Sequence, residues 1–194
     1  NKNGNLFIKE AFDKGASLAI INKFDRSKNI NKQIKVKNTL NFLTKCSSIL
    51  RKNVSSKIIA ITGSCGKTSL KELLGKTLKK ISKVTYSPKS YNNRFGVPLS
   101  LFNLSINDDF GIFEIGMDKK GEIDSLSKIV KPDVGVITNI SYAHAKNFDN
   151  IKEIALAKSE IINNIKNDGA IVLNGDDQFY DLHKKIALRR KLKV

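Results

Sequence analysis

The chain has 194 residues, of which 40% are hydrophobic, and its formal net charge is +17 at pH 7. No apolar run approaches the roughly 20 residues that span a bilayer, which excludes a membrane-spanning helix. Two cysteines are too few for a disulfide framework or a cysteine metal cluster, and they fit a reducing cytosol. The lysines are dispersed, with no basic stripe interleaved with aromatics, which argues against a nucleic-acid partner and suits a phosphate-rich substrate.

The first part of the sequence predicts the end of a small α/β domain. Residues 5–22 predict a helix that stops at Gly15 and is followed by a short strand, and residues 32–36 predict another strand. Apolar residues at helical spacing predict a helix at 39–53, so we expect this domain to cover residues 1–54. Because the chain starts with neither Met nor a signal peptide, we expect it to begin inside a longer protein.

From residue 55 to residue 194, predicted strands and helices alternate along the chain. Strands are expected at 58–62, 83–87, 110–116, 133–140 and 169–174, and helices at 67–80, 122–130 and 151–165, with a helix or turn at 98–104 and a last helix starting near 181. This alternation predicts an α/β fold with a mostly parallel sheet flanked by helices.

A loop of small residues, GSCGKT, joins the first of these strands to its helix. This order is typical of a P-loop, in which backbone N–H groups and a helix N-terminus hold phosphate. Lys67 is expected to reach the β- and γ-phosphates, and the Thr68 hydroxyl is expected to hold Mg²⁺. The predicted nucleotide-binding residues are Gly63, Ser64, Cys65, Gly66, Lys67 and Thr68. The alternative is a glycine-rich turn that binds nothing.

The loop departs from the general P-loop pattern in one respect. That pattern, G-x-x-x-x-G-K-[ST], has glycine where Ile61 stands, so the loop here is a shorter G-x-x-G-K-T. Cys65 has no obvious base partner in the sequence, and we interpret it as a filler of the loop and not as a nucleophile.

Four further features are each open to two interpretations. Glu114 is the only charge in an apolar strand, so it is either a magnesium ligand facing the nucleotide crevice or an ordinary acid at a strand end. His144 follows a strand and is either a metal ligand or a surface residue. Lys158 has apolar neighbours on its helix and is either partly buried or solvated. The amide-rich stretch 90–98 is either a substrate loop or a plain turn.

Taken in order, these motifs resemble the central domain of the Mur ligases, the ATP-dependent amide-forming enzymes of bacterial cell-wall precursor synthesis. The stretches are ITGSCGKTSLKE, NNRFGVPLSLF, FEIGMDKKGEI, TNISYAHAKNF, ALAKSEI and GAIVLNGDD. The resemblance covers residues 55–180 well and residues 4–54 loosely, as the end of an N-terminal domain that binds the uridine-diphosphate substrate. N-N-x-x-G-V-P-L and E-I-G-M-x-x-x-G-E-I most resemble the members that add D-alanyl-D-alanine to a UDP-N-acetylmuramoyl-tripeptide.

The resemblance implies ATP and Mg²⁺ as cofactors and assigns a role to each matching residue. Lys67 would bind phosphate, and Thr68 and Glu114 would hold a first Mg²⁺. His144 would bind a second Mg²⁺, and Lys158 would be a carbamylated lysine. Lys67, His144 and Lys158 would therefore be the catalytic residues, with metals and lysine neutralising the transferring phosphoryl group.

The resemblance also implies the substrates and the reaction. Asn92 and Asn93 would contact the UDP-N-acetylmuramoyl-peptide, whose carboxylate takes the γ-phosphoryl group of ATP before the amine of D-alanyl-D-alanine attacks. A monomeric, cytoplasmic enzyme is implied. Ala145 and Asp149 stand where the family pattern has Leu and Gly, next to the histidine.

Three other functions remain open. A folylpolyglutamate-type ligase would use the same phosphate-binding loop and bind metal ions in the same way, although the N-N-x-x-G-V-P stretch argues against it. A basic P-loop module acting on nucleic acid would show a steeply salt-dependent affinity for DNA or RNA. A fragment that folds or binds nucleotide without turnover is the third alternative.

Overall fold

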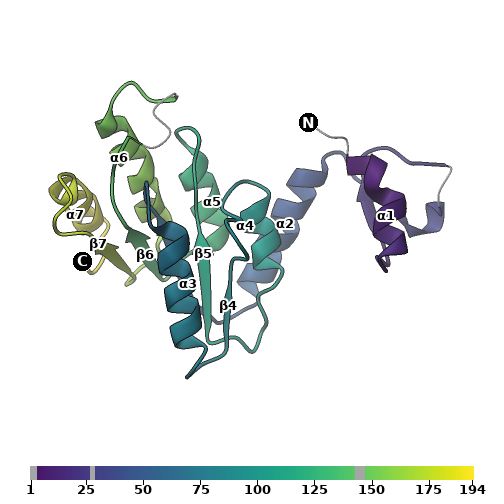
Figure 1. The fold of residues 1–194 in the computed structure, drawn as a ribbon, viewed down its shortest axis with the longest axis horizontal. Helices are drawn as coiled ribbons and strands as arrows, with labels where there is room; N and C mark the ends of the chain where they lie inside the picture. The colour runs from purple at the N-terminus through teal and green to yellow at the C-terminus, as the bar shows by residue number, and fades with distance from the viewer. Residues whose placement is uncertain (1–3, 27–28, 143–146) are drawn as a thin grey trace. The chain divides into compact units, whose positions relative to one another are not determined.

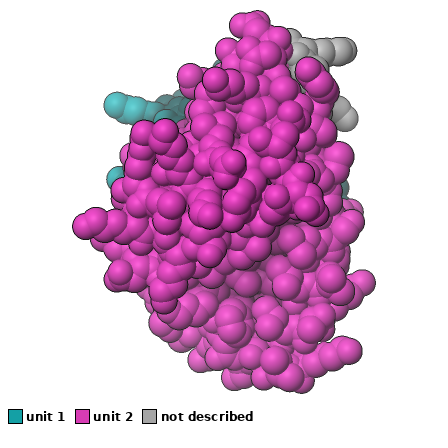
Figure 2. Space-filling model, turned by 90° about the vertical axis from the view of Figure 1, so that its left-hand side faces the viewer, with its two compact units in different colours: residues 1–46 teal, residues 47–194 magenta. Residues whose placement is uncertain are grey.

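The computed structural model describes residues 4–26, 29–142 and 147–194. The chain divides into two compact units, residues 1–46 and residues 47–194, which Figure 2 colours separately. The domain boundary expected after residue 54 stays a prediction.

The first unit is a small α/β arrangement. Its elements are the 3-10 helix η1 (Gly4–Phe7), the helix α1 (Ile8–Asp13), the strand β1 (Ala19–Ile21), the 3-10 helix η2 (Ile30–Lys32) and the strand β2 (Gln33–Lys35). The two strands are parallel, with Ile20 opposite Ile34. Gly15 follows α1 with a φ of +92°, a left-handed conformation that glycine adopts without strain. The helix α2 (Thr39–Lys52) starts in this unit and ends in the second.

The second unit contains a five-stranded parallel sheet in the order β4-β5-β3-β6-β7 (Figure 1). The strands are β3 (Lys57–Thr62), β4 (Val84–Tyr86), β5 (Phe110–Glu114), β6 (Val134–Ile137) and β7 (Ala170–Leu173). The helices are α3 (Lys67–Leu78), α4 (Gly96–Leu101), α5 (Glu122–Val130), α6 (Ile151–Ser159), the 3-10 helix η4 (Glu160–Asn164) and α7 (Tyr180–Arg189). The predicted α/β fold is confirmed.

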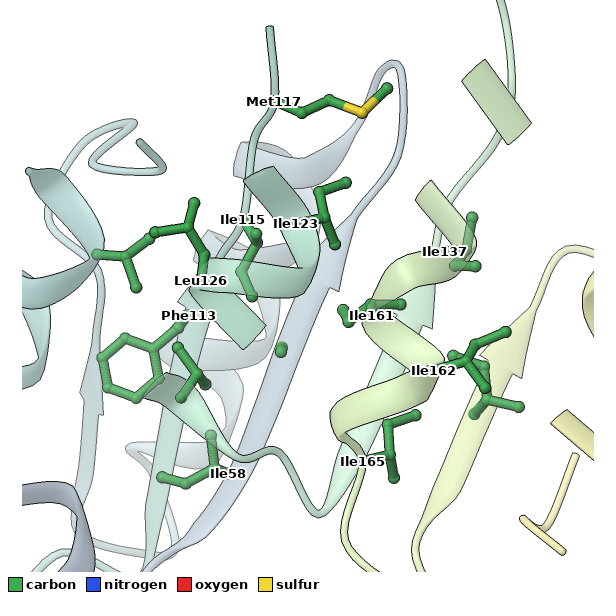
Figure 3. Packing of buried hydrophobic residues seen from close by; sticks show 14 of the residues in the cluster. Ile58, Phe113, Ile115, Met117, Ile123, Leu126, Ile137, Ile161, Ile162 and Ile165 are labelled. Atoms are coloured by element: carbon green, nitrogen blue, oxygen red, sulfur yellow. The ribbon is translucent and has the colours of Figure 1, made fainter. Parts of the chain in front are cut away.

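Apolar side chains cover both faces of this sheet. Because successive side chains of a strand point to opposite faces, Ile112 and Phe113 of β5 belong to different hydrophobic clusters. Leu74 of α3 packs in the Ile112 cluster, whereas Ile123 of α5 and Ile161 of η4 lie in the Phe113 cluster. Figure 3 shows side chains of α5 and η4 gathered over the strands on that second face. Burial on both faces explains why these strands are continuous apolar runs.

Several elements end earlier than the sequence predicts, among them two strands and one helix. The strand expected to reach residue 116 ends at Glu114, and the next strand ends at Ile137 and not at 140. The helix expected at 151–165 is α-helical only to Ser159 and continues as a 3-10 helix. Beyond Glu114 the chain leaves the sheet, because the Gly116 N–H donates to the carbonyl of Asn92 in a neighbouring loop.

The register places the carboxyl ends of β5, β3 and β6 side by side. Ile61 of β3 lies opposite Glu114 of β5, and Thr62 lies opposite Ile137 of β6. The chain moves from β3 toward β4 and β5 on one side and then to β6 and β7 on the other. In open parallel sheets, ligands bind outside the carboxyl ends of the strands at such a change of direction.

Candidate functional site

Two glycines give the loop after β3 its shape. Gly63 has a φ of +145°, and a Cβ added there would lie 1.9 Å from Oγ1 of Thr138, so only glycine fits. Gly66 caps the N-terminus of α3 in the left-handed conformation, with a φ of +80°. Ile61 lies inside β3 and is fully buried, so the loop starts two residues later than the general P-loop pattern has it. The loop therefore turns directly from the sheet into a helix N-terminus that favours anions.

The segment that follows β6 holds this loop in place. The N–H groups of Ser64 and Cys65 donate to the backbone carbonyl and the side-chain oxygen of Asn139, at 2.9 and 3.0 Å. The Ser64 hydroxyl donates to the carbonyl of Ser141 at 3.0 Å and accepts its N–H at 2.8 Å, and the Thr138 hydroxyl donates to the Cys65 carbonyl at 2.6 Å. Sequence reasoning missed Asn139 and Ser141, although a polar run directly after a buried strand was a usable signal.

Lys67 stands at the start of α3 with its ammonium folded over the loop. Its Nζ donates to the carbonyls of Gly63 at 2.7 Å and Ser64 at 3.2 Å. Burial lowers the pKa of Lys67, while the nearby carboxylate of Glu114 and the thiol of Cys65 act in the opposite direction. A phosphate oxygen is a stronger, charged acceptor than these two neutral carbonyls, so the ammonium is placed to exchange them for a phosphate.

Glu114, at the end of β5, has a carboxylate that neutral donors surround. Its side chain is 1% exposed; Oε2 accepts the Thr68 hydroxyl at 2.8 Å, and Oε1 accepts the Asn92 amide at 2.7 Å. Its N–H donates to the Ser87 hydroxyl at 3.3 Å, and the Ser90 Oγ lies 3.3 Å from Oγ1 of Thr68. Within the part of the chain that the structure describes, Glu114 has no ion-pair partner. A buried carboxylate that accepts hydrogen bonds only from neutral groups, with the Lys67 ammonium nearby but not paired to it, fits a cation.

Magnesium suits this donor set better than a metal that needs many protein ligands. The described residues contain no group of three or more His, Cys, Asp or Glu side chains that could hold a metal ion. Mg²⁺ is usually held by one or two carboxylates together with phosphates and water, and a P-loop hydroxyl is a common additional ligand. One buried carboxylate hydrogen-bonded to the Thr68 hydroxyl, beside a phosphate loop, meets that description.

Lys158 lies in α6 and is buried, with 1% of its surface exposed. Its Nζ has no hydrogen-bond partner among residues 4–26, 29–142 and 147–194. Burial and, to a smaller degree, the positive charge of Lys67 lower the pKa of Lys158 to about 7, and Cys65 opposes this shift. A much larger share of the Lys158 amine is therefore neutral near pH 7 than in an ordinary lysine. His144, the other expected ligand here, lies outside the described residues.

A cavity of about 730 Å³ opens beside the loop. Lys67 and Asn92 line it, together with Asn93, Arg94 and Lys119. The two asparagines have different contacts: Asn92 bonds to the Glu114 carboxylate, whereas the side-chain oxygen of Asn93 accepts the N–H groups at the start of α4, at 2.9 and 3.0 Å. One part of the cavity wall is thus tied to the buried carboxylate, and the rest carries both cations and acids, since Asp118 and Glu122 also line it.

Residues 61–194 match the model of the Mur ligase middle domain. The chain belongs to the Mur ligase family. The UDP-N-acetylmuramoyl-tripeptide–D-alanyl-D-alanine ligase of Buchnera aphidicola subsp. Baizongia pistaciae is 35% identical to this Mur ligase chain over 192 residues, which are 99% of the chain and 42% of that relative. The chain therefore spans less than half the length of the curated relative that it matches.

Solved structures agree with this assignment. A crystal structure of MurF from Acinetobacter baumannii has a TM-score of 0.85 and 32% identity, covering 95% of the Mur ligase chain and 40% of that protein. MurF ligase from Thermotoga maritima, solved in complex with ADP, has a TM-score of 0.82 and 30% identity, covering 96% and 43%. No helix among the described residues of the Mur ligase chain is long and apolar enough to cross a membrane.

Proposed function

We propose that the chain is part of an ATP-dependent ligase that joins D-alanyl-D-alanine to a UDP-N-acetylmuramoyl-tripeptide, as the names of its relatives state for those proteins. The observation that carries the proposal is the contact between the Thr68 hydroxyl and the buried Glu114 carboxylate, beside a phosphate-type loop and a large cavity. In this proposal residues 1–54 belong to the domain that binds the uridine-diphosphate end, and residues 55–194 to the ATP-binding domain of a monomeric cytoplasmic enzyme.

In this proposal the nucleotide lies on the loop Gly63–Thr68, where the N–H groups of the helix N-terminus hold its phosphates while those of Ser64 and Cys65 stay bonded to Asn139. The Lys67 ammonium leaves the loop carbonyls and binds the β- and γ-phosphates. Thr68 and Glu114 would hold a magnesium ion, which supplies positive charge against the phosphates during transfer. The Thermotoga maritima relative was solved in complex with ADP, which supports a nucleotide as the ligand in this proposal.

Lys158 and His144 are proposed to form a second cation site. A neutral Lys158 amine adds to the carbon of CO₂, forms an N–C bond and releases one proton, and the product is a carbamate with a negative charge. The lowered pKa of Lys158 supports this step because only the neutral amine carries the lone pair that reacts. A carbamate oxygen and an imidazole would be the ligands of a magnesium ion near the γ-phosphate.

The cavity is proposed to hold the muramoyl-peptide so that its carboxylate faces the γ-phosphate. The carboxylate oxygen bonds to phosphorus, ADP leaves, and the acyl phosphate forms; the D-alanyl-D-alanine amine then bonds to the acyl carbon and phosphate leaves. Asn92 and Asn93 line this cavity, and Arg94 and Lys119 are cations that suit an anionic UDP-peptide. The chain's own part is to orient the peptide and to place cations around the phosphates.

The test is release of phosphate, together with formation of the amide product, when the full-length protein that contains this chain is given Mg·ATP, UDP-N-acetylmuramoyl-tripeptide and D-alanyl-D-alanine. We expect turnover only when all three are present. Turnover with a folate and glutamate in place of the two cell-wall substrates would instead favour the folylpolyglutamate-type ligase. Binding of DNA or RNA that weakens steeply with salt, without ligation, would favour the nucleic-acid module.

A further inference from the structure

Lys71 is a fully buried lysine that the proposed chemistry does not use. It lies in α3, one turn after Thr68, and 0% of its surface is exposed. Its Nζ donates a hydrogen bond to the backbone carbonyl of Lys89, lies 3.1 Å from a Glu72 carboxylate oxygen and stands 6.0 Å from the centre of the Tyr86 ring. Lysines are almost never fully buried unless they are paired, so these partners account for the burial.

The carbonyl that Lys71 holds belongs to a segment in an unfavourable backbone conformation. Lys89 has a φ of +48°, in the left-handed region that a residue with a Cβ rarely adopts. Such a conformation persists only where the surrounding structure fixes it, and such residues cluster at ligand sites. The Lys71 ammonium, a charged donor inside the protein, is a strong anchor for this carbonyl.

Directly after Lys89 the same segment reaches both the proposed magnesium ligands and the cavity of the candidate site. The Oγ of Ser90 lies 3.3 Å from the Thr68 hydroxyl, and the Asn92 N–H donates to the carbonyl of Ser90 at 2.8 Å. Asn92 then donates to Glu114 at 2.7 Å and also lines the 730 Å³ cavity. The four residues from Lys89 to Asn92 thus connect the Lys71 anchor to the proposed magnesium ligands and to the proposed peptide cavity.

We propose that Lys71 is a positioning residue, whose ammonium fixes the Lys89 carbonyl and thereby holds Ser90 beside Thr68 and Asn92 between Glu114 and the cavity. The inference rests on the proposed function and adds to it the residue that couples the magnesium ligands to the peptide cavity. Because one anchored segment serves both, release of the anchor weakens the binding of Mg·ATP and of the muramoyl-peptide together.

Arg51 provides a matched control, because it is also a buried cation that donates to backbone carbonyls. Its guanidinium donates to the carbonyls of Val130, Val54 and Lys131 at 2.8, 3.2 and 3.0 Å. These partners precede β6 and β3, so Arg51 acts at the amino ends of the strands, whereas the candidate site is at the carboxyl ends. If the role of Lys71 were purely structural, removal of Lys71 and removal of Arg51 would have the same effect on every kinetic constant.

The experiment compares Lys71→Met with Arg51→Met in the protein. The measured quantities are the KM for ATP, the KM for UDP-N-acetylmuramoyl-tripeptide, kcat and the unfolding temperature. We expect Lys71→Met to raise both KM values about tenfold, with a smaller change in kcat, since it removes one charge-assisted hydrogen bond. Arg51→Met is expected to lower the unfolding temperature and to leave both KM values unchanged. Equal KM values in the two variants would overturn the inference.

A double-mutant cycle with Ser90→Ala separates positioning from a general loss of stability. Ser90 does not bond to Lys71, so the two effects on the KM for ATP add if the residues act independently. If Lys71 acts by holding the segment, Ser90→Ala changes this KM much less in the Lys71→Met protein than in the wild type. Additive effects contradict the inference. If Lys71→Met does not fold, Lys71→Gln takes its place in the same cycle. Because Gln keeps a neutral N–H donor, we expect a smaller rise in the KM for ATP.

Failure of the proposed function gives a different result. A wild-type protein that binds Mg·ADP in calorimetry but never joins D-alanyl-D-alanine contradicts the proposed function alone. In that case the Kd of Mg·ADP replaces the KM values, and Lys71→Met is still expected to raise it about tenfold relative to Arg51→Met. An unchanged Kd for Mg·ADP would overturn the positioning role whatever the protein ligates.

Discussion

The two edges of the central sheet differ in the partners of their carboxylates. At the amino ends of the strands, Asp133 accepts the N–H of Ile58 at 2.8 Å and lies 3.0 Å from Lys166 and 3.7 Å from Arg51. At the carboxyl ends, the Glu114 carboxylate has only neutral donors within the described part of the chain. Asp133 at the amino edge therefore forms ion pairs within the protein, whereas Glu114 at the carboxyl edge has the Lys67 ammonium nearby but no direct ion pair among the described residues.

The largest effect is expected from Lys67→Ala, at the carboxyl edge. Removal of a positioned cation from a phosphoryl-transfer site costs on the order of 3–5 kcal/mol, measured as the loss of kcat/KM for ATP. Lys57→Ala is the matched control, because Lys57 is an exposed lysine whose Nζ lies 4.0 Å from Asp133 at the amino edge. We expect Lys57→Ala to keep normal kinetics. Similar kcat/KM values for the two variants would contradict the comparison of the edges.

The opposite result is expected from Asp133→Ala. Without this carboxylate, the guanidinium of Arg51 remains buried without its counter-charge, which costs about 3 kcal/mol in the free energy of unfolding. Denaturant unfolding measures the loss, and the KM for ATP of the folded fraction is expected to stay normal. A raised KM with unchanged stability would show that the amino edge also shapes the site.

The sequence predicted the parts of the site whose signal is local. Glycines at fixed spacing predicted the turn at Gly63 and Gly66, and a lone acid in an apolar strand indicated Glu114 as a candidate. The alternation of apolar runs predicted the parallel sheet, and so it predicted the edge at which these residues meet.

Other site residues depend on contacts between distant segments. Asn139 holds the loop only because β6 lies next to β3, and the order of the strands cannot be predicted from either segment alone. Lys71 has the ordinary sequence pattern of a helical lysine, and its burial follows from the loop that folds over it. His144 was selected from its resemblance to a family motif and stays a prediction.

Lys158 gives the third prediction, in which stability and activity change in opposite directions. Because burial and Lys67 lower the folded pKa to about 7, below the usual pKa of 10.5, the folded state binds fewer protons than the unfolded state between these values. Stability therefore rises as pH increases through this range. Lys158→Met removes the buried amine, so it is expected to stabilise the protein by about 2 kcal/mol at pH 7 and to slow ligation, although less than Lys67→Ala does.

Chemical rescue distinguishes the two possible roles of Lys158 in activity. If Lys158 acts as a carbamate, short carboxylic acids should restore part of the activity of Lys158→Ala, and added amines should not. Rescue by amines would indicate a cationic role. Normal activity of Lys158→Ala without any addition would remove this residue from the site.

A smaller effect is expected from Arg94, which is exposed at the cavity and stacks on the neighbouring ring of Phe95 with a distance of 5.2 Å to its centre. Arg94→Gln is expected to raise the KM for the UDP-N-acetylmuramoyl-tripeptide about fivefold, because an exposed ion pair contributes at most about 1 kcal/mol. The KM of Arg94→Lys, which keeps the charge, should lie between the KM of the wild type and that of Arg94→Gln. An equal rise in the KM for ATP would mean that Arg94 disturbs the loop and not peptide binding.

The smallest effect concerns His183, which joins α7 to α6, the helix of Lys158. Its Nε2 lies 3.1 Å from the carbonyl of Ala155, and burial lowers the pKa of His183 below its usual 6.5, against opposing effects of that carbonyl and of Asp177. The unfolded state then binds the proton first as the pH falls, so His183 should make the protein less stable below about pH 6.5. Unfolding temperatures between pH 5 and pH 8 measure this loss. His183→Gln, which cannot be protonated, should flatten the profile in this range, whereas an unchanged profile would assign the acid sensitivity to other groups.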